Sequence, residues 1–242
     1  MVWEPRTYRQ VVDAPGLVAF AVTHEETDLQ VLAGRDLSRE AARAVAVLRA
    51  DLEHYLARHP RYAESYVPVV VEVDAPEIVR AMAAAGEVAG CGPMAAVAGA
   101  IAERVARALE PDSTEVIVEN GGDIYVAGRT SRRILLVAGD SPLSGRVAIV
   151  LDPGALPVAV CTSSGKVGHS VSLGSAHAAT VIAPDGALAD AVATALGNRV
   201  HGPADVEEAL AWACGVPGVR GAVVIAGDTI GAQGDVRLEP AG

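Results

Sequence analysis

The most constraining feature of this 242-residue chain is a pair of adjacent glycines, Gly121-Gly122, set between two β-like runs. Residues 116–118 (Val-Ile-Val) precede the pair and residues 124–126 (Ile-Tyr-Val) follow it. Glycine adopts positive φ angles at little cost, so this arrangement predicts a β-hairpin with a tight turn. A plain turn accounts for the glycines but requires neither of the flanking acids, Glu119 and Asp123. Two interpretations therefore stand side by side, a structural turn and a loop that contacts a ligand.

The composition excludes several classes of partner. Aromatic residues make up 3% of the chain and its formal net charge is −11, so we expect no nucleic-acid binding through stacked bases or a basic surface. Three cysteines without CxxC spacing fit a reduced, cytoplasmic protein without a zinc site. The longest uncharged run, residues 88–102, is too short and too interrupted by glycine and proline to span a bilayer. The high apolar content, 51%, leads us to expect a homodimer.

The first half of the chain predicts three helices. Amphipathic spacing predicts a helix from Ser38, as its N-cap, to the His59-Pro60 pair. A second helix begins at Asp74-Ala75-Pro76-Glu77 and ends near Gly86 or Gly90, and Pro68 makes the intervening residues 67–73 a weak edge strand or an extended linker.

The third helix follows the break at Cys91-Gly92-Pro93-Met94 and ends before Pro111. Val97, Ile101 and Val105 lie along one line of it, and small residues cover most of its other faces. We expect this helix to be buried. Its N-terminal N–H groups are a ready site for an anion, although an ordinary packing helix is an equally simple interpretation.

The rest of the chain predicts a mostly antiparallel sheet packed with helices. No repeat or linker divides the sequence, so we expect residues 1–242 to form a single α+β domain. The expected strands are 17–22, 28–33, 115–119, 123–127, 132–138, 145–151, 157–161, 177–183, 220–226 and 235–238, with the last two joined by turns at 227–228 and Gly231, and the remaining helices are 187–198 and 204–214.

A second polar stretch, residues 161–170, follows the strand that ends at Val160. Its hydroxyls, glycines, Lys166 and His169 could surround a phosphate, although the spacing matches neither a P-loop nor a nucleophile elbow. A serine-rich surface loop is the alternative. Cys161 would be a nucleophile only with His169 as its base, and a buried cysteine at a strand end is commoner.

A third candidate site is the pair Asp190 and Thr194, four residues apart on the predicted helix 187–198. A carboxylate and a hydroxyl one turn apart can hold a hard cation. An aspartate near a helix start is more commonly there for the helix dipole, so the signal is weak alone. In the same part of the chain, we expect His177 to be a satisfied histidine in the core or at the sheet edge.

In this order along the chain, three segments resemble the ApbE-like flavin transferases. They are residues 116–128 (VIVENGGDIYVAG), 158–165 (VAVCTSSG) and 180–197 (TVIAPDGALADAVATALG). The chain is more similar to a neighbouring uncharacterised family, UPF0280. That similarity is carried by residues 92–99, 119–123 and 162–165, together with Gly168-His169-Ser170.

The resemblance implies an ApbE-like, T-fold-related domain. The transferases move FMN from FAD onto a threonine of a target protein and use magnesium. The resemblance therefore implies magnesium at Asp190 and Thr194. His169 is the best candidate for a general acid or base, because its unperturbed pKa lies near neutrality. The residues that would contact FAD or FMN are Asn120, Gly121, Gly122, Asp123, Thr162, Ser163, Ser164 and Gly165.

The chain also departs from the transferase pattern. It has Gly92-Pro93-Met94 where the transferases have Ala-Lys-Gly, and it lacks their His-x-x-Asp-Pro segment. We expect a magnesium-dependent flavin-binding protein or an enzyme that resembles an FMN transferase or cleaves a flavin pyrophosphate. The alternative is a non-catalytic binding protein for a small anionic cofactor or metabolite. A purely structural or assembly protein is a third interpretation, which leaves the polar loops unexplained.

Overall fold

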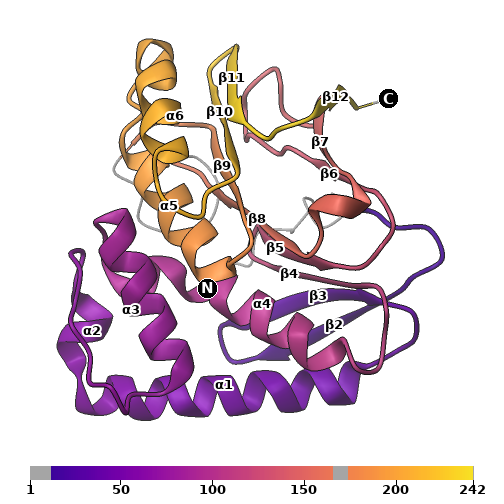
Figure 1. The fold of residues 1–242 in the computed structure, drawn as a ribbon, viewed down its shortest axis with the longest axis vertical. Helices are drawn as coiled ribbons and strands as arrows, with labels where there is room; N and C mark the ends of the chain where they lie inside the picture. Colours follow the sequence, from indigo (N-terminus) through magenta and orange to yellow (C-terminus); the bar gives the residue numbers. More distant parts are fainter. Residues whose placement is uncertain (1–11, 166–173, 242) are drawn as a thin grey trace.

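The computed structural model describes residues 12–165 and 174–241 of the chain. Two antiparallel sheets and a layer of helices make up the fold (Figure 1). The larger sheet has the strand order β11-β10-β9-β8-β5-β4-β3-β2, and the smaller has the order β1-β6-β7-β12. The strands of the larger sheet are β2 (Val18–His24), β3 (Thr27–Ala33), β4 (Val116–Asn120), β5 (Asp123–Ala127), β8 (Val158–Ser163), β9 (Ala178–Ala183), β10 (Gly221–Ala226) and β11 (Thr229–Gly234). Those of the smaller sheet are β1 (Val12–Asp13), β6 (Arg132–Leu135), β7 (Val147–Leu151) and β12 (Leu238–Pro240).

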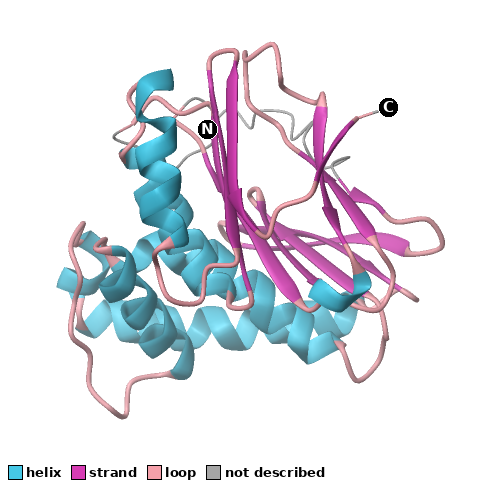
Figure 2. Cartoon of the chain, turned by 45° about the horizontal axis from the view of Figure 1, so that its top comes forward, coloured by secondary structure: helices cyan, strands magenta, loops and turns pink. Residues whose placement is uncertain are grey.

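The helices cover one face of the larger sheet (Figure 2). Helix α6 packs on β10 and β11, α5 on β8 and β9, α4 on β4 and β5, and α1 on β2, while α3 lies against α5 and α1. The helices are α1 (Ser38–Arg58), α2 (Pro60–Glu64), α3 (Glu77–Ala89), α4 (Val97–Leu109), α5 (Gly186–Asn198) and α6 (Val206–Cys214), with 3₁₀ turns η2 (Pro93–Ala96), η3 (Pro153–Ala155) and η4 (Pro203–Asp205).

The central strands of the larger sheet are buried on both faces, whereas the outer strands β2 and β11 are partly exposed. In β10, Ala222 and Val224 face the helices, while Val223 and Ile225 face the smaller sheet. One hydrophobic core therefore lies between the helices and the larger sheet, and another lies between the two sheets. In the part of the chain described here, no single helix is long and apolar enough to cross a membrane; α3 and the segment Pro93–Leu109 reach that length only together, with a 105° bend.

The expected α+β architecture with a mostly antiparallel sheet is confirmed, but the C-terminal strands differ from the prediction. Residues 229–234 form β11, where we expected a turn at Gly231, and β10 and β11 join through a tight turn at 227–228. Gly231 pairs with Val224 of β10, and the ends of the Val206 and Leu210 side chains of helix α6 occupy the space that a Cβ at this position would take. The prediction that 235–238 closes the same sheet was wrong, since β12 pairs with β7 in the smaller sheet.

In the first half, one prediction was wrong, one helix was missed, and one open alternative is decided. Ser38 is the first residue of α1 rather than its N-cap; Leu37 holds the N-cap position, and the Ser38 N–H donates to the Asp36 carboxylate at 2.9 Å. The short helix α2 was not predicted. Residues 67–73 form no strand, so the extended-linker alternative holds.

Helices α4 and α5 cross with almost no separation between their backbones. A Cβ atom added to Gly99 would collide with the Gly186 carbonyl oxygen, and one added to Gly186 would collide with the Gly99 carbonyl oxygen. This contact places the start of α5 against the first turn of α4. The two glycines are therefore required by the packing of these helices.

We expect Gly99→Ala to lower the free energy of unfolding by about 2 to 4 kcal/mol, because the added methyl group forces the helices apart. Helix propensity alone predicts the opposite, since alanine is favoured over glycine within a helix by about 1 kcal/mol. Urea denaturation followed by circular dichroism measures the change. Gly154→Ala is the control, because a Cβ there meets nothing within 4 Å. Equal stability of Gly99→Ala and wild type would contradict the described crossing.

Candidate functional site

Two carboxylates meet between the larger sheet and the helices. Asp123 begins β5 and alternates with Ile124, which faces the smaller sheet, so its side chain points toward the helices. Ile124 of β5 pairs with Val160 of β8. Extending this antiparallel register by one residue places Asp123 beside Cys161. Asp190 comes from α5, and its charge is close enough to raise the pKa of Asp123.

The environment of this pair disfavours negative charge. Burial, and then the charge of Asp190, hold the pKa of Asp123 well above its usual range. Burial raises the pKa of Asp190 to about 7, although the N–H groups of Gly99 and Ala98 favour its ionised form. Within residues 12–165 and 174–241, no arginine, lysine or histidine forms an ion pair with either acid. The pair is therefore a buried acidic centre, and no basic side chain of the described residues balances it.

Asp190 also closes the N-terminus of α4. The residue at the N-cap position of α4 is Ala96, whose side chain cannot accept a hydrogen bond. The Gly99 N–H donates instead to Asp190 Oδ2 at 2.9 Å. The anion site that we expected at this helix start is thus filled by the protein's own carboxylate, and Asp190 interacts with the dipole of α4 rather than that of its own helix.

Glu103 makes the reciprocal contact, which we did not predict. This buried residue of α4 accepts the Gly186 N–H, at the start of α5, on Oε2 at 2.6 Å. Its other oxygen accepts from Arg107 Nε at 2.7 Å. The signal in the sequence is the single acid of this helix, whose first six residues are all small or apolar. Each helix therefore lends a carboxylate to the first turn of the other.

The Gly121-Gly122 turn is a two-residue hairpin, because Asn120 pairs with Asp123. The φ angles of the two glycines are 67° and 105°, so turn chemistry accounts for both of them. Glu119 Oε1 accepts the Gly122 N–H at 2.9 Å, and Asn120 Nδ2 donates to the Ala98 carbonyl at 3.1 Å. The turn is thus tied to the first turn of α4, next to the acidic pair.

The stretch 162–165 lies beside this turn, but its hydroxyls point in different directions. The Thr162 N–H donates to Asp123 Oδ1 at 3.2 Å, whereas its hydroxyl bonds with that of Thr180 at 2.9 Å on the far face of the sheet. Ser163 faces α5, and the Ser164 hydroxyl donates to the His177 carbonyl at 2.8 Å. Strand alternation separates adjacent side chains, so the residues do not form one hydroxyl cluster.

The remaining candidates divide into three groups. Thr194 is half-buried, one helical turn beyond Asp190. Lys166 and His169 lie outside the described residues. Cys161 is buried, donates to the Gly186 carbonyl at 3.7 Å, and has a pKa raised by burial and by the nearby acids, which disfavours a thiolate nucleophile.

His177 has hydrogen-bond partners at both ring nitrogens, as expected. Its Nδ1 accepts the Gly227 N–H at 3.1 Å, and its Nε2 lies 3.2 Å from Asp140 Oδ1. The prediction of a satisfied histidine is confirmed, and its position is just before β9, an interior strand of the larger sheet.

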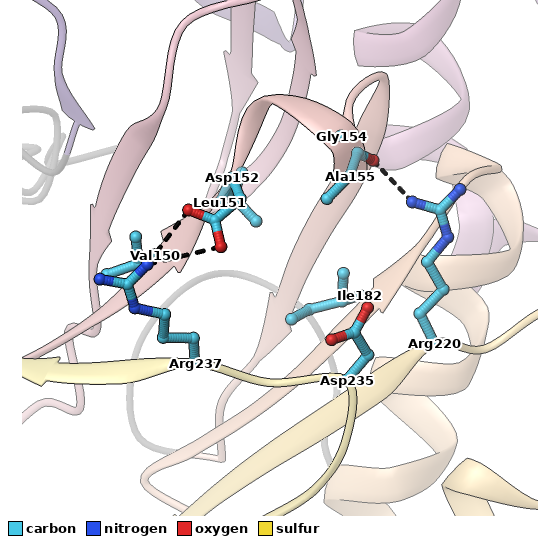
Figure 3. Close-up of a pocket in the computed structure, with 9 residues that line it drawn as sticks. All are labelled: Val150, Leu151, Asp152, Gly154, Ala155, Ile182, Arg220, Asp235 and Arg237. Atoms are coloured by element: carbon cyan, nitrogen blue, oxygen red, sulfur yellow. Dashed lines mark hydrogen bonds and ion pairs between the residues drawn. The ribbon is translucent and has the colours of Figure 1, made fainter.

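A separate hollow of about 330 Å³ lies near the other end of β9, around Ile182 (Figure 3). Both arginines of this hollow already have partners within the protein. Arg237 Nη1 lies 3.1 Å from Asp152 Oδ1, and Arg220 Nη1 donates to the Ala155 carbonyl at 2.6 Å. Asp123 and Asp190 have no basic partner among the described residues, so the acidic pair is the stronger candidate for binding a cation.

The acidic pair does not by itself supply a full set of metal ligands. Among the residues with described positions, no group of three or more His, Cys, Asp or Glu side chains is arranged to hold a metal ion. A cation at the pair would therefore complete its shell with hydroxyl, carbonyl, water or phosphate oxygens. Such oxygen shells are typical of Mg²⁺ rather than Zn²⁺.

Solved structures share this fold. The ApbE protein of Thermotoga maritima superposes with a TM-score of 0.63 at 13% identity, over 89% of this chain and 96% of that one. The flavin transferase ApbE from Vibrio cholerae gives 0.57 at 13% identity, over 90% and 96%. At this identity the likeness establishes the fold alone.

Similarity in sequence establishes the family. A UPF0280 protein of Methanopyrus kandleri is 45% identical over 225 residues, covering 90% of this chain and 91% of that protein. One from Methanocaldococcus jannaschii is 43% identical over 203 residues, covering 82% of each. The family model described as "AbpE bacteria" matches residues 9–230. The chain therefore belongs to this AbpE family of bacteria and to the UPF0280 proteins, and it has the fold of the ApbE flavin transferases.

Proposed function

We propose that this protein binds a flavin nucleotide, FAD or FMN, together with a magnesium ion held at the acidic pair. The observation that supports this most directly is the burial of Asp123 and Asp190 beside each other without a basic partner among the described residues. Burying two like charges is costly unless a proton or a cation compensates them. A divalent cation between the carboxylates would remove that cost.

The chemistry of the available oxygens suits a hard cation. Asp123 Oδ1 and Asp190 Oδ2 each accept a backbone N–H, which leaves lone pairs on each carboxylate for a cation. The hydroxyl of Thr194, one turn along α5, would add a third ligand. Magnesium bound there would neutralise negative charge on a pyrophosphate.

The nucleotide would lie over the hairpin turn and the end of β8. The turn presents the backbone of Gly121 and Gly122 without side chains, and a Cβ at Gly122 would come within 3.7 Å of the Thr162 carbonyl. Residues Asn120 and 162–165 would contact the ligand from either side. Because solved structures with this fold include flavin transferases, we expect a flavin nucleotide as the ligand rather than another nucleotide.

Whether a reaction follows binding divides the proposal into two versions. In the catalytic version, His169 is the general acid or base for FMN transfer or pyrophosphate cleavage. In the other, the protein holds a small anionic cofactor without turnover. The Gly92-Pro93-Met94 start of η2, in place of a lysine-containing motif, favours the second version. Only the catalytic version predicts magnesium-dependent turnover of FAD that is lost in Asp190→Asn.

The raised pKa values predict how stability depends on pH when no divalent cation is present. Between about pH 4 and pH 7 the folded state binds more protons at Asp123 and Asp190 than the unfolded state does, because unfolded aspartate has a pKa of about 3.9. The free energy of unfolding should therefore fall as pH rises from 5 to 8, by about 1 to 3 kcal/mol from this pair. Asp190→Asn should flatten that fall, as measured by urea denaturation at each pH.

Asp51→Asn is the matched control, because Asp51 is an exposed aspartate on α1. It should keep the wild-type dependence on pH. If wild type and Asp190→Asn lost stability in parallel between pH 5 and pH 8, the acidic pair would not be the source of the penalty.

Thermal shift with ligands tests the proposed function itself. At pH 8 we expect Mg²⁺ with FAD to raise the melting temperature of wild type by several degrees, since ligand at about 100 Kd stabilises by about 2.7 kcal/mol. Asp123→Asn and Asp190→Asn should lose the Mg²⁺-dependent part, and Asp51→Asn should retain it. FMN, which has the flavin without adenine, and ADP, which has adenine without the flavin, are tested alongside. A shift with only one of them identifies the part of FAD that is recognised. The absence of a shift with FAD, FMN or ADP would contradict the flavin proposal.

A further inference from the structure

The segment that joins α2 to α3, residues 66–73, exposes an unusual amount of apolar surface. Tyr66 is 73% exposed, Val67 64%, Val70 98% and Val73 91%. The segment runs along the outer side of the helical layer, away from both sheets (Figure 1). Contiguous exposed apolar residues of this kind mark an interaction surface more often than chance.

The backbone of this segment has the geometry of a strand that lacks a neighbour. Val69 and Val71 pack on the helical core, while Val70 between them points to solvent, which is the two-residue period of a strand. Within the described parts of the chain, the backbone N–H groups of these three valines have no hydrogen-bond partner. An extended, β-branched edge with free donors is a template for adding another strand.

The position of Pro68 determines which side of the segment can pair. In a strand, the N–H and C=O groups of alternate residues point to the same side. Val69 and Val71 therefore offer their N–H groups on one side, and Pro68, which has no N–H, lies on the other with Val70. Pairing through the first side uses these two donors and avoids the proline. The extended stretch ends at Val73, where the chain enters a turn closed by the Ala75 N–H and the Glu72 carbonyl.

The pattern of the segment matches an antiparallel copy of itself. The sequence of residues 67–73 is Val-Pro-Val-Val-Val-Glu-Val. Its valines occupy the same positions when the segment is read in either direction from Val70, and Pro68 and Glu72 occupy equivalent positions on the two sides. A two-fold axis at Val70 would set Val69 of one copy opposite Val71 of the other, and the reverse. A two-fold interface requires this kind of self-complementarity.

The charges that flank the segment favour the same arrangement. The stretch before it carries Arg58 and Arg61 with Glu64. The C-terminal end of the segment carries Glu72, and the stretch after it carries Asp74 and Glu77 with Arg80. Antiparallel pairing sets the basic flank of one copy against the acidic flank of the other, whereas parallel pairing sets like charges together. A hollow of about 460 Å³ beside Arg61 and Val67 would receive Val73 of the second copy.

We propose that two copies of this chain associate through residues 66–73, as an antiparallel two-stranded ribbon with its two-fold axis at Val70. The Val70 side chains of the two copies pack against each other at the axis. This surface is independent of the acidic pair, so the proposed ligand site is not needed for the association.

Sedimentation equilibrium on the full chain tests the proposal. Because one ribbon makes a small interface, the measurement should reach about 100 μM protein. Wild type should sediment at twice the 24.7 kDa chain mass. Val70→Asp, at a fully exposed position, should keep the wild-type melting temperature and raise the dimer Kd at least about 100-fold, because it places two carboxylates side by side. Val47→Asp on α1, also at an exposed valine, should remain dimeric.

A crosslink tests the register. In a Cys214→Ser background, Val70→Cys should form a disulfide between two copies under mild oxidation, because residue 70 lies opposite itself, and Val67→Cys should not. Wild type that stays monomeric at the highest concentration would overturn the proposal. So would a dimer that withstands Val70→Asp, or a dimer of the Val70→Cys variant that fails to crosslink.

Discussion

The crossing of α4 and α5 is the contact on which the rest of the structure depends. Gly99 and Gly186 let the two backbones touch, and each helix supplies a carboxylate to the other's first turn, Asp190 to Gly99 and Glu103 to Gly186. The contact fixes where α5 lies over β8 and β9 and thereby brings Asp190 to Asp123. The acidic centre is thus a consequence of how these helices pack.

Asp190 consequently has two roles that share one geometry. Its carboxylate caps α4, which is a structural function, and it keeps lone pairs for a ligand. Asparagine could accept the same backbone N–H groups that Asp190 and Asp123 accept from Gly99 and Thr162, so these contacts alone do not require two carboxylates. A bound cation would offset the free-energy cost of burying two carboxylates. The stability of the folded protein would therefore depend on the binding of that cation.

Local patterns were sufficient to predict much of the fold. The runs that became β4, β5, β9 and β10 alternate or are continuously apolar between clear turn residues, and α1 has an unbroken amphipathic stripe. β11 was missed because glycine usually marks a turn, whereas Gly231 pairs with Val224 of β10 and packs beneath the side chains of Val206 and Leu210 in helix α6. The placement of β12 depends on a second sheet that no local pattern reveals.

The candidate site divides in the same way. Sequence order and family resemblance pointed to the Gly121-Gly122 turn, to residues 162–165 and to Asp190, and the structure brings the turn, Thr162 and the two aspartates together. The capping contacts join residues 91 and 83 positions apart, which spacing along the chain cannot indicate. Strand alternation, rather than proximity in sequence, decided that the Thr162 hydroxyl points away from the acidic pair.

The proposed binding of a divalent cation between Asp123 and Asp190 can be observed directly. An anomalous difference map from crystals grown with Mn²⁺ would locate the ion, because Mn²⁺ shares the preference of Mg²⁺ for oxygen ligands. We expect a single strong peak within coordination distance of both carboxylates, absent in Asp190→Asn. A map without a peak at this pair, or with manganese bound only elsewhere, would contradict the proposal.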